Sequence, residues 1–291
     1  MGIVIISGVI LGAVYVIVAT GLTLTALPTG VFNFAQGAIV VGGSFLGYQW
    51  LTVVGMPFAL ALLVTALAGA AVGVLCELIA VRPLRWVRGA ESSNTIVTTV
   101  GVSTALVGLY GVKWGYQPQV VPFPGPSVVF RLFGESISPV DIVLVSLAVV
   151  APIALHLWVR QTRRGQACLA VAENREASML RGVNVDVLSI GAFAAAGTLG
   201  ALAGMATGPI TYAIPTLGTA LALGGFVALA LGGSGSFTGG LIGGMLVGLV
   251  SSAATRYINA DYSDVGVLVL LLITLAVRPK GFGGSAETRR V

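Results

Sequence analysis

Two long stretches without charge, joined by one short polar segment, constrain this chain more than any other feature. Residues 1–76 and 187–255 contain no Asp, Glu, Lys or Arg, whereas residues 160–186 contain five arginines and three acidic residues. One crossing of a bilayer takes about 20 apolar residues, so each uncharged stretch has room for about three crossings. We therefore expect an integral membrane protein in which a compact polar loop separates two groups of spans.

The composition and the start of the chain agree with this expectation. Only 9% of the residues are charged and 56% are hydrophobic, whereas about 25% of the residues of a soluble domain are charged. The first apolar segment lacks a basic n-region, so we interpret it as a retained span and not as a signal peptide. The predicted fold is a single all-α transmembrane domain over residues 1–291, a polytopic bundle of about eight or nine segments, one of them broken or re-entrant. The candidate spans are about 3–28, 36–54, 56–81, 93–112, 139–160, 187–208, 219–233, 236–255 and 265–277.

The basic residues predict the orientation of these spans. Twelve of the 15 Lys and Arg residues fall in one set of loops, which the positive-inside rule assigns to the cytoplasm. If three crossings precede the first of these loops, the N-terminus lies outside. The net charge of +5 is thus explained by orientation, and no nucleic-acid partner is expected. The cytoplasmic set is Arg82, Arg85, Arg88, Arg160, Arg163, Arg164, Arg175, Arg181, Arg278, Lys280, Arg289 and Arg290, and the outer set is Lys113, Arg131 and Arg256.

The predicted outer loop, residues 113–138, is rich in proline and aromatic residues. Proline prevents a long helix and favours extended or turn backbone. This loop is either a docking surface for an extracellular partner or an ordinary interfacial loop with aromatic anchors, and the sequence leaves both interpretations open.

The chain lacks the groups that most membrane enzymes and ion-coupled carriers use. The centres of the candidate spans contain no ionisable residue, although proton and ion relays usually need one within the membrane. The nucleotide-binding pattern GxxxxGK[ST] and the zinc pattern HExxH are absent, and Cys76 and Cys168 form no CxxC pair. We predict no catalytic residue, no metal site and no cofactor bound by this chain. If it moves a solute uphill, the energy must come from another subunit.

The polar loop contains the signals of a short helix. Asn174 is a good N-cap residue, and Glu176 in the first turn has the charge that the helix dipole favours. Arg181 is expected in the last turn, and Gly182 suits the C′ position, where the backbone adopts a left-handed conformation. These features predict a two-turn helix over residues 175–181.

Small side chains on this short helix suggest a contact with another protein. Ala177 and Ser178 keep one side of the helix thin, so the backbone of a partner can approach closely. The alternative is a solvated cytoplasmic linker that only sets the topology. The residues of the loop alone do not distinguish a contact surface from a linker.

Polar residues also interrupt the first apolar stretch. Asn33 and Gln36 have amides that need partners, because an unsatisfied polar group at membrane depth costs several kcal/mol. Gly30 and Gly37 flank them and permit a helix break. Broken helices are common along transport pathways, which makes these four residues a candidate translocation path. A purely structural hydrogen bond between helices is the alternative.

Glycines recur at four-residue intervals near the end of the chain. This GxxxG spacing places glycines on one helix face and lets helices pack closely. Helix packing is the favoured interpretation, although a moving gate would use the same property. The predicted packing residues are Gly200, Gly204, Gly235, Gly239, Gly240, Gly244 and Gly248.

Four blocks in order resemble the LivH-type permeases of ATP-binding cassette (ABC) transporters for branched-chain amino acids. The segment 162–205 is similar to their cytoplasmic loop and following span, and it contains Glu176-Ala177-Ser178, three residues, and Gly182. That pattern resembles the Glu-Ala-Ala signature of ABC permeases, with Ser178 replacing the third small residue. The other blocks are residues 11–43, 233–252 and the tail RPKGFGG at 278–284, so the resemblance covers essentially the whole chain.

The resemblance implies a transport subunit in the cytoplasmic (inner) membrane. Such a permease pairs with a second, homologous permease, and two ATPase subunits, which carry ATP and Mg, bind the cytoplasmic loops through residues corresponding to Glu176, Ala177, Ser178, Arg181 and Gly182. A substrate-binding protein delivers the solute from outside, and membrane lipid surrounds the complex. The substrates are typically leucine, isoleucine, valine or related amino acids, with urea and short amides in sister groups. A stand-alone channel and a structural scaffold remain as alternatives.

Overall fold

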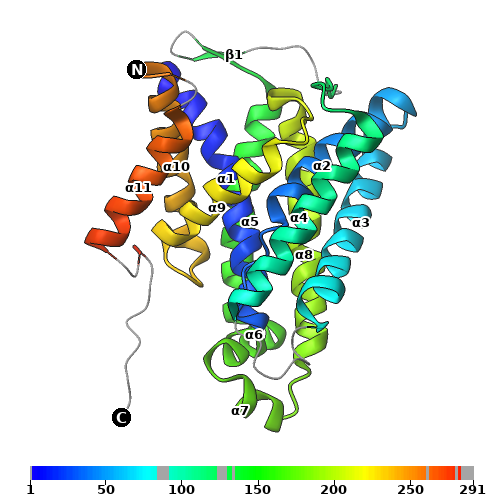
Figure 1. Cartoon of the computed structure of the whole chain (residues 1–291), viewed down its shortest axis with the longest axis vertical. Helices are drawn as coiled ribbons and strands as arrows, with labels where there is room; N and C mark the ends of the chain where they lie inside the picture. The colour runs from blue at the N-terminus through cyan, green and yellow to red at the C-terminus, as the bar shows by residue number, and fades with distance from the viewer. Residues whose placement is uncertain are drawn as a thin grey trace.

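The computed structural model describes residues 2–83, 92–122, 130–132, 135–259, 262–278 and 281–282. Its long helices run side by side between two ends of the molecule (Figure 1). Before the polar loop, the elements are α1 (Gly2–Thr29), α2 (Gln36–Tyr48), the π-helix η1 (Gln49–Val53), α3 (Phe58–Cys76), the π-helix η2 (Glu77–Val81), α4 (Ser92–Trp114), the strands β1 (Phe130–Leu132) and β2 (Glu135–Ile137), and α5 (Pro139–Gln161). From the polar loop onward they are α6 (Arg163–Glu173), α7 (Arg175–Leu180), α8 (Val185–Thr211), α9 (Leu217–Gly232), α10 (Phe237–Tyr257) and α11 (Ser263–Val277).

The described residues establish a polytopic helical membrane protein. Each of the nine candidate spans coincides with a helical segment, and six helices are long and apolar enough to cross a bilayer: Gly2–Thr29, Phe58–Val81, Thr95–Trp114, Pro139–Gln161, Val185–Thr211 and Phe237–Tyr257. The apolar helices α9 and α11 are shorter. The strands β1 and β2 form a small antiparallel ribbon in the proline-rich outer loop, in which Phe130 pairs with Ile137. The described bundle itself is helical, as predicted.

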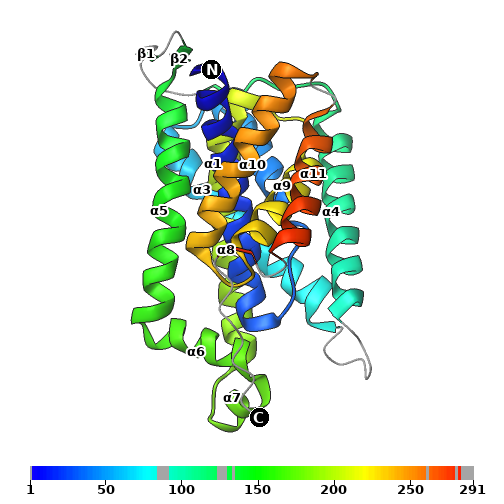
Figure 2. The ribbon, with the colours of Figure 1, turned by 90° about the vertical axis from the view of Figure 1, so that its left-hand side faces the viewer.

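The two ends of the bundle differ as the basic residues predict. Figures 1 and 2 show α6 and α7 beyond one end of the spans, whereas β1, β2 and the start of α1 lie at the other end. We call these the cytoplasmic end and the outer end, following the positive-inside rule. The predicted cytoplasmic residues Arg85, Arg88, Lys280, Arg289 and Arg290 lie outside the described residues.

Helix α1 occupies the centre of the bundle. Every residue from Gly12 to Thr25 is buried, and α1 packs against α5, α8, α9 and α10. The Thr20 hydroxyl donates to the Val16 carbonyl (2.7 Å) and the Thr23 hydroxyl to the Ala19 carbonyl (2.8 Å). These local bonds satisfy hydroxyl groups that would otherwise lack partners in the apolar interior.

Glycines allow the backbones of neighbouring helices to touch. A Cβ on Gly204 of α8 would overlap the Val40 carbonyl oxygen of α2, and one on Gly248 of α10 would overlap Gly12 of α1. Gly239 and Gly244 also approach backbone atoms closely, Gly200 makes room for the Gln36 side chain, and Gly240 has only an ordinary contact, 3.7 Å from the Ala19 Cβ. Small residues at helix interfaces are the usual means of close packing in membranes.

The prediction that Gly235 is a packing residue is wrong. Gly235 precedes α10 and has a φ of +87°, and a Cβ added to it would have no described atom within 4 Å. Its lack of a side chain serves the turn between α9 and α10, because L residues rarely adopt this backbone conformation.

Candidate functional site

The predicted break in the first apolar stretch lies between α1 and α2. Helix α1 ends at Thr29, Gly30 has a φ of +72°, and α2 begins at Gln36. The Asn33 side-chain oxygen accepts a hydrogen bond from the Ala35 amide (3.2 Å), which holds the carboxamide over the start of α2. Asn33 is buried, and its side-chain nitrogen has no hydrogen-bond partner among the described residues.

Gln36 extends from the start of α2 into the interior of the bundle. Its Nε2 donates to the Ala196 carbonyl of α8 (2.8 Å) and lies 2.7 Å from where a Cβ on Gly200 would stand. This bond is the interhelical hydrogen bond that the structural interpretation anticipates. The Oε1 atom is also buried but has no partner within the described part of the chain, so the carboxamide is only half satisfied.

A second break lies between α8 and α9, in the gap between the candidate spans 187–208 and 219–233, although sequence reasoning did not identify it as part of a site. Helix α8 ends at Thr211, and Tyr212 adopts φ +61° and ψ 163°, a combination that is strained for a residue with a side chain. The next residue, Ala213, forms an isolated β-bridge with Gln119. Pro215, inside the uncharged stretch, was the available signal for this break.

The starts of α2 and α9 meet inside the bundle. A Cβ on Gly37 would overlap the Gly218 carbonyl oxygen, and one on Gly218 would lie 3.2 Å from the Ala38 Cα. The prediction that Gly37 permits the helix break is therefore wrong: Gly37 lies within α2, and its missing side chain allows contact with α9. Each of these helices begins directly after a break in the chain. Because a helix N-terminus carries partial positive charge, two partly positive ends lie close together here.

The polar loop folds as two short helices at the cytoplasmic end (Figure 2). Asn174 caps α7 as predicted, because its Oδ1 accepts from the Ala177 amide (2.9 Å). Gly182 has a φ of +84°, and its amide donates to the Met179 carbonyl (2.9 Å) while the Val183 amide donates to the Ser178 carbonyl (3.1 Å). This pair of bonds is a Schellman motif, which confirms the predicted left-handed turn.

Two details of the loop differ from the predictions. Helix α7 ends at Leu180, so Arg181 is the C-cap residue and does not lie in the last turn. Ser178 is buried, and its hydroxyl donates to the Asn174 carbonyl (2.8 Å), so the prediction that it keeps an outward side thin is wrong. Glu176 and Gly182 are exposed.

Two apolar side chains on the loop point away from the protein, and sequence reasoning overlooked them. Leu180 is 90% exposed and Met179 is 47% exposed. Leu180 therefore contributes little to packing within this chain, and exposed apolar residues mark sites of protein contact when they cluster. Apolar residues between the arginines of the loop were the signal that could have identified them.

Helix α6 fixes the loop to the bundle. Its buried face includes Cys168, which packs in one apolar cluster with Leu24 and Leu27 of α1 and Phe237 of α10. Burial raises the pKa of the Cys168 thiol to about 11, so this cysteine is a protonated apolar group at neutral pH and not a reactive thiolate. The described residues contain no group of three or more His, Cys, Asp or Glu side chains that could hold a metal ion.

Comparisons with known proteins cover almost the whole chain. The family model described as branched-chain amino acid transport system / permease component matches residues 4–276. The chain is 30% identical to the high-affinity branched-chain amino acid transport system permease protein LivH of Escherichia coli (strain K12), covering 98% of this chain and 96% of that protein. It is also 30% identical to the probable branched-chain amino acid transport permease protein LivH of Methanocaldococcus jannaschii, covering 96% and 91%.

A more distant similarity extends beyond amino-acid systems. The chain is 24% identical to the ribose import permease protein RbsC of Haemophilus influenzae, over 91% of this chain and 81% of that protein. No solved structure matches the chain significantly. The family model covers nearly all the spans, and the two LivH relatives match over 96% and 91% of their own length. The chain therefore belongs to the family of permease components of branched-chain amino acid transport systems.

Proposed function

We propose that this chain is the transmembrane permease subunit of an ABC importer that moves branched-chain or related amino acids across the cytoplasmic membrane. The observation that carries this proposal is the match over 98% of the chain to a relative named as such a permease. The uncharged span centres support it, because they offer no ion relay. ATP and Mg are bound and ATP is hydrolysed on separate subunits, and no cofactor is bound by this chain.

The proposed topology has eight or nine crossings, and nine crossings place the start of α1 outside and the C-terminal tail in the cytoplasm. Six helices are long enough to span alone, and the 16-residue α9 and 15-residue α11 supply two shorter spans. Helix α2 continues into η1 without interruption, which supports a ninth. The short length of α2 and α9 follows from the two breaks, since each of these helices begins inside the bundle.

The proposed partners are a second homologous permease, two ATPase subunits and an extracellular or periplasmic substrate-binding protein. The cytoplasmic loop supplies the contact with one ATPase through Glu176, Ala177, Arg181 and Gly182, with Leu180 as its apolar centre. Exposure of Leu180 on a turn held by a Schellman motif supports this assignment. The buried Ser178 stabilises the turn and does not itself touch the partner.

The proposed translocation path passes the first helix break, at Gly30, Asn33 and Gln36, and the adjoining contact of Gly37 with the start of α9. Half-satisfied carboxamides at membrane depth are costly unless they acquire partners during the working cycle. The convergence of the α2 and α9 starts supports the same place, because broken helices line substrate sites in other transporters.

Replacing Gln36 by leucine is expected to lower substrate uptake about tenfold, because it removes a hydrogen bond worth about 1 kcal/mol or more at a site of transport. Asn33→Leu should act in the same direction. Membrane abundance should be nearly normal, and uptake is measured per molecule of inserted protein. Gln49→Leu is the matched control, because Gln49 bonds Trp114 away from the break (3.0 Å). Unchanged uptake in both variants would show that these residues are structural.

The substrate class is tested by competition in cells that express this chain with its partner subunits. Uptake of labelled L-leucine should be inhibited by isoleucine and valine, but not by urea, acetamide or ribose. If urea or acetamide is taken up instead, the chain serves a short-amide transporter. Leucine uptake that needs no ATPase subunit would favour a stand-alone channel.

A further inference from the structure

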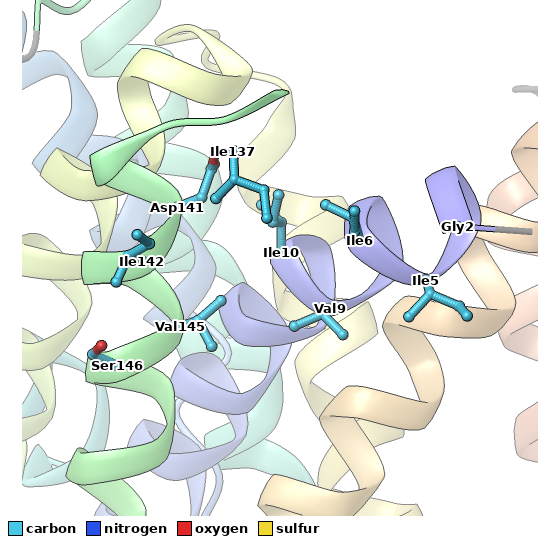
Figure 3. Close-up of a pocket in the computed structure, with 10 residues that line it drawn as sticks. All are labelled: Gly2, Ile5, Ile6, Val9, Ile10, Ile137, Asp141, Ile142, Val145 and Ser146. Atoms are coloured by element: carbon cyan, nitrogen blue, oxygen red, sulfur yellow. The ribbon is translucent and has the colours of Figure 1, made fainter. Parts of the chain in front are cut away.

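Two cavities open at the outer end of the bundle, on different faces of α1. The larger, about 630 Å³, lies between the start of α1 and α5 (Figure 3). Its wall is apolar except for Asp141 and Ser146, and the Asp141 carboxylate already accepts the Ser138 amide (2.7 Å) as part of the α5 cap. Among the described residues that line this cavity, Ser146 is therefore the only polar side chain not already engaged in the α5 cap, and no cationic group faces it.

The second cavity, about 510 Å³, is chemically different. It lies between α1, α5, α8 and α10, and its volume falls within the range of about 300–1,000 Å³ that small-molecule sites occupy. Several hydroxyl groups and one guanidinium share its wall with a broad apolar surface. The lining residues are Ile3, Val4, Ser7, Ile10, Leu11, Val14, Leu144, Thr207, Ile210, Thr211, Ser252, Thr255 and Arg256.

Four of the hydroxyl groups can act only as acceptors toward a ligand. A hydroxyl has one hydrogen to donate and two lone pairs to accept with, and each of these four already donates its hydrogen to a backbone carbonyl. What remains for the cavity is a set of lone pairs, which is suited to a donor such as an ammonium group. The bonds are Thr207 to Ala203 (2.7 Å), Thr211 to Thr207 (3.3 Å), Ser252 to Val4 (3.1 Å) and Thr255 to Ser251 (2.9 Å).

Arg256 supplies hydrogen-bond donors and a positive charge, whereas the hydroxyl groups supply acceptors. It lies in the last turn of α10, next to Thr255, and is the one charged residue among those that line the cavity. A guanidinium is a donor with no acceptor and binds carboxylates with two parallel hydrogen bonds. The isoleucine, leucine and valine side chains complete the wall with a surface for a branched apolar group.

We propose that this cavity is an outer binding site for a free amino acid with a branched apolar side chain. Its ammonium group contacts the oxygens of Ser252, Thr255 and neighbouring hydroxyls, its carboxylate binds Arg256, and its side chain lies on the apolar wall. The inference rests on the proposed function and names the place where substrate first binds the permease from outside. The site is distinct from the helix break, since none of its lining residues belongs to the segment 30–37.

The test compares ligands that lack one of the two charges. Binding to the purified full-length chain is measured by calorimetry for L-leucine, for 3-methylbutylamine, which lacks the carboxylate, and for 4-methylpentanoate, which lacks the ammonium group. Arg256→Gln should weaken leucine and 4-methylpentanoate about tenfold or more, the usual effect of losing a charge-assisted hydrogen bond, and leave the amine unchanged. Thr255→Val combined with Ser252→Ala should weaken leucine and the amine and leave 4-methylpentanoate unchanged.

Lys113→Gln is the matched control, because Lys113 is an outer basic residue that stacks on the Trp114 ring outside the cavity. It should change none of the three affinities. The proposal is overturned if leucine does not bind, if Arg256→Gln weakens all three ligands equally, or if no variant changes leucine affinity. It is also overturned if the cavity retains an anionic phospholipid through Arg256 in nanodiscs and leucine does not displace it.

Uptake by the complete transporter separates this inference from the proposed function. If the wild-type complex takes up leucine and Arg256→Gln does not change how uptake depends on leucine concentration, the outer site is overturned and the proposed function stands. Failure of the wild-type complex to take up any branched-chain amino acid overturns the function itself.

Discussion

Replacing Gly182 by valine is expected to reduce ATP-driven uptake about tenfold or more while the protein still inserts in the membrane. Gly182 has a φ of +84°, and a left-handed conformation costs an L residue about 1–2 kcal/mol, more for a β-branched one. Because 1.4 kcal/mol is a factor of ten in an equilibrium, the Schellman turn that presents Leu180 should no longer be the dominant conformation. Pull-down of the ATPase subunits and uptake are measured on the same membranes.

Two further variants separate the turn from its surroundings. Leu180→Ser removes the exposed side chain without strain and should also weaken ATPase binding, because a buried leucine contributes about 1.5–3 kcal/mol to a contact. Gly191→Val is the control: Gly191 lies in α8 without a positive φ, and a Cβ added to it would have no described atom within 4 Å, so it should have little effect. Normal ATPase association and uptake in both loop variants would show that the loop only sets topology.

Replacing Gly204 by valine should have the largest effect on folding. A Cβ there would overlap the Val40 carbonyl oxygen and lie 3.1 Å from the Gly43 Cα. Because the overlapped atom belongs to the backbone, a valine side chain would force α2 and α8 apart. Overpacking of this kind lowers the free energy of unfolding by about 3 kcal/mol or more. A loss of that size corresponds to a fall in Tm of about 10 °C for a chain of this length. Thermal denaturation of detergent-solubilised protein measures it.

Gly101→Val controls for the general effect of valine in a membrane helix. Gly101 lies in α4, and a Cβ added to it would have no described atom within 4 Å. Its variant should shift the Tm by no more than a few degrees. Equal shifts at Gly101 and Gly204 would contradict the assignment of Gly204 to a backbone contact.

Local patterns in the sequence predicted the spans and the loop helix well. Hydrophobic runs specify membrane helices because lipid requires every backbone group to be bonded within the segment, and each candidate span is helical. The ends of α7 were predictable for a similar reason: an asparagine cap and a glycine in the left-handed turn act within a few residues. The break at Gly30 was likewise marked by polar residues in an apolar stretch.

Features that depend on distant contacts were not predictable. The role of Gly37 is set by Gly218, far along the chain, and the burial of Ser178 is set by how the loop folds on itself. The gap between the candidate spans 187–208 and 219–233 marked the end of α8, but nothing local showed that the start of α9 contacts the start of α2. For Gly235 the GxxxG spacing was misleading, because α10 begins only at Phe237 and Gly235 precedes it.

The most direct test of the central claim is uptake by proteoliposomes that contain purified protein. Liposomes with this chain, its partner permease, the ATPase subunits and the substrate-binding protein should accumulate L-leucine only when ATP is present on the ATPase side. Liposomes with this chain alone should neither hydrolyse ATP nor accumulate leucine under an imposed proton gradient. Concentrative uptake by the chain alone, driven by that gradient, would contradict the account.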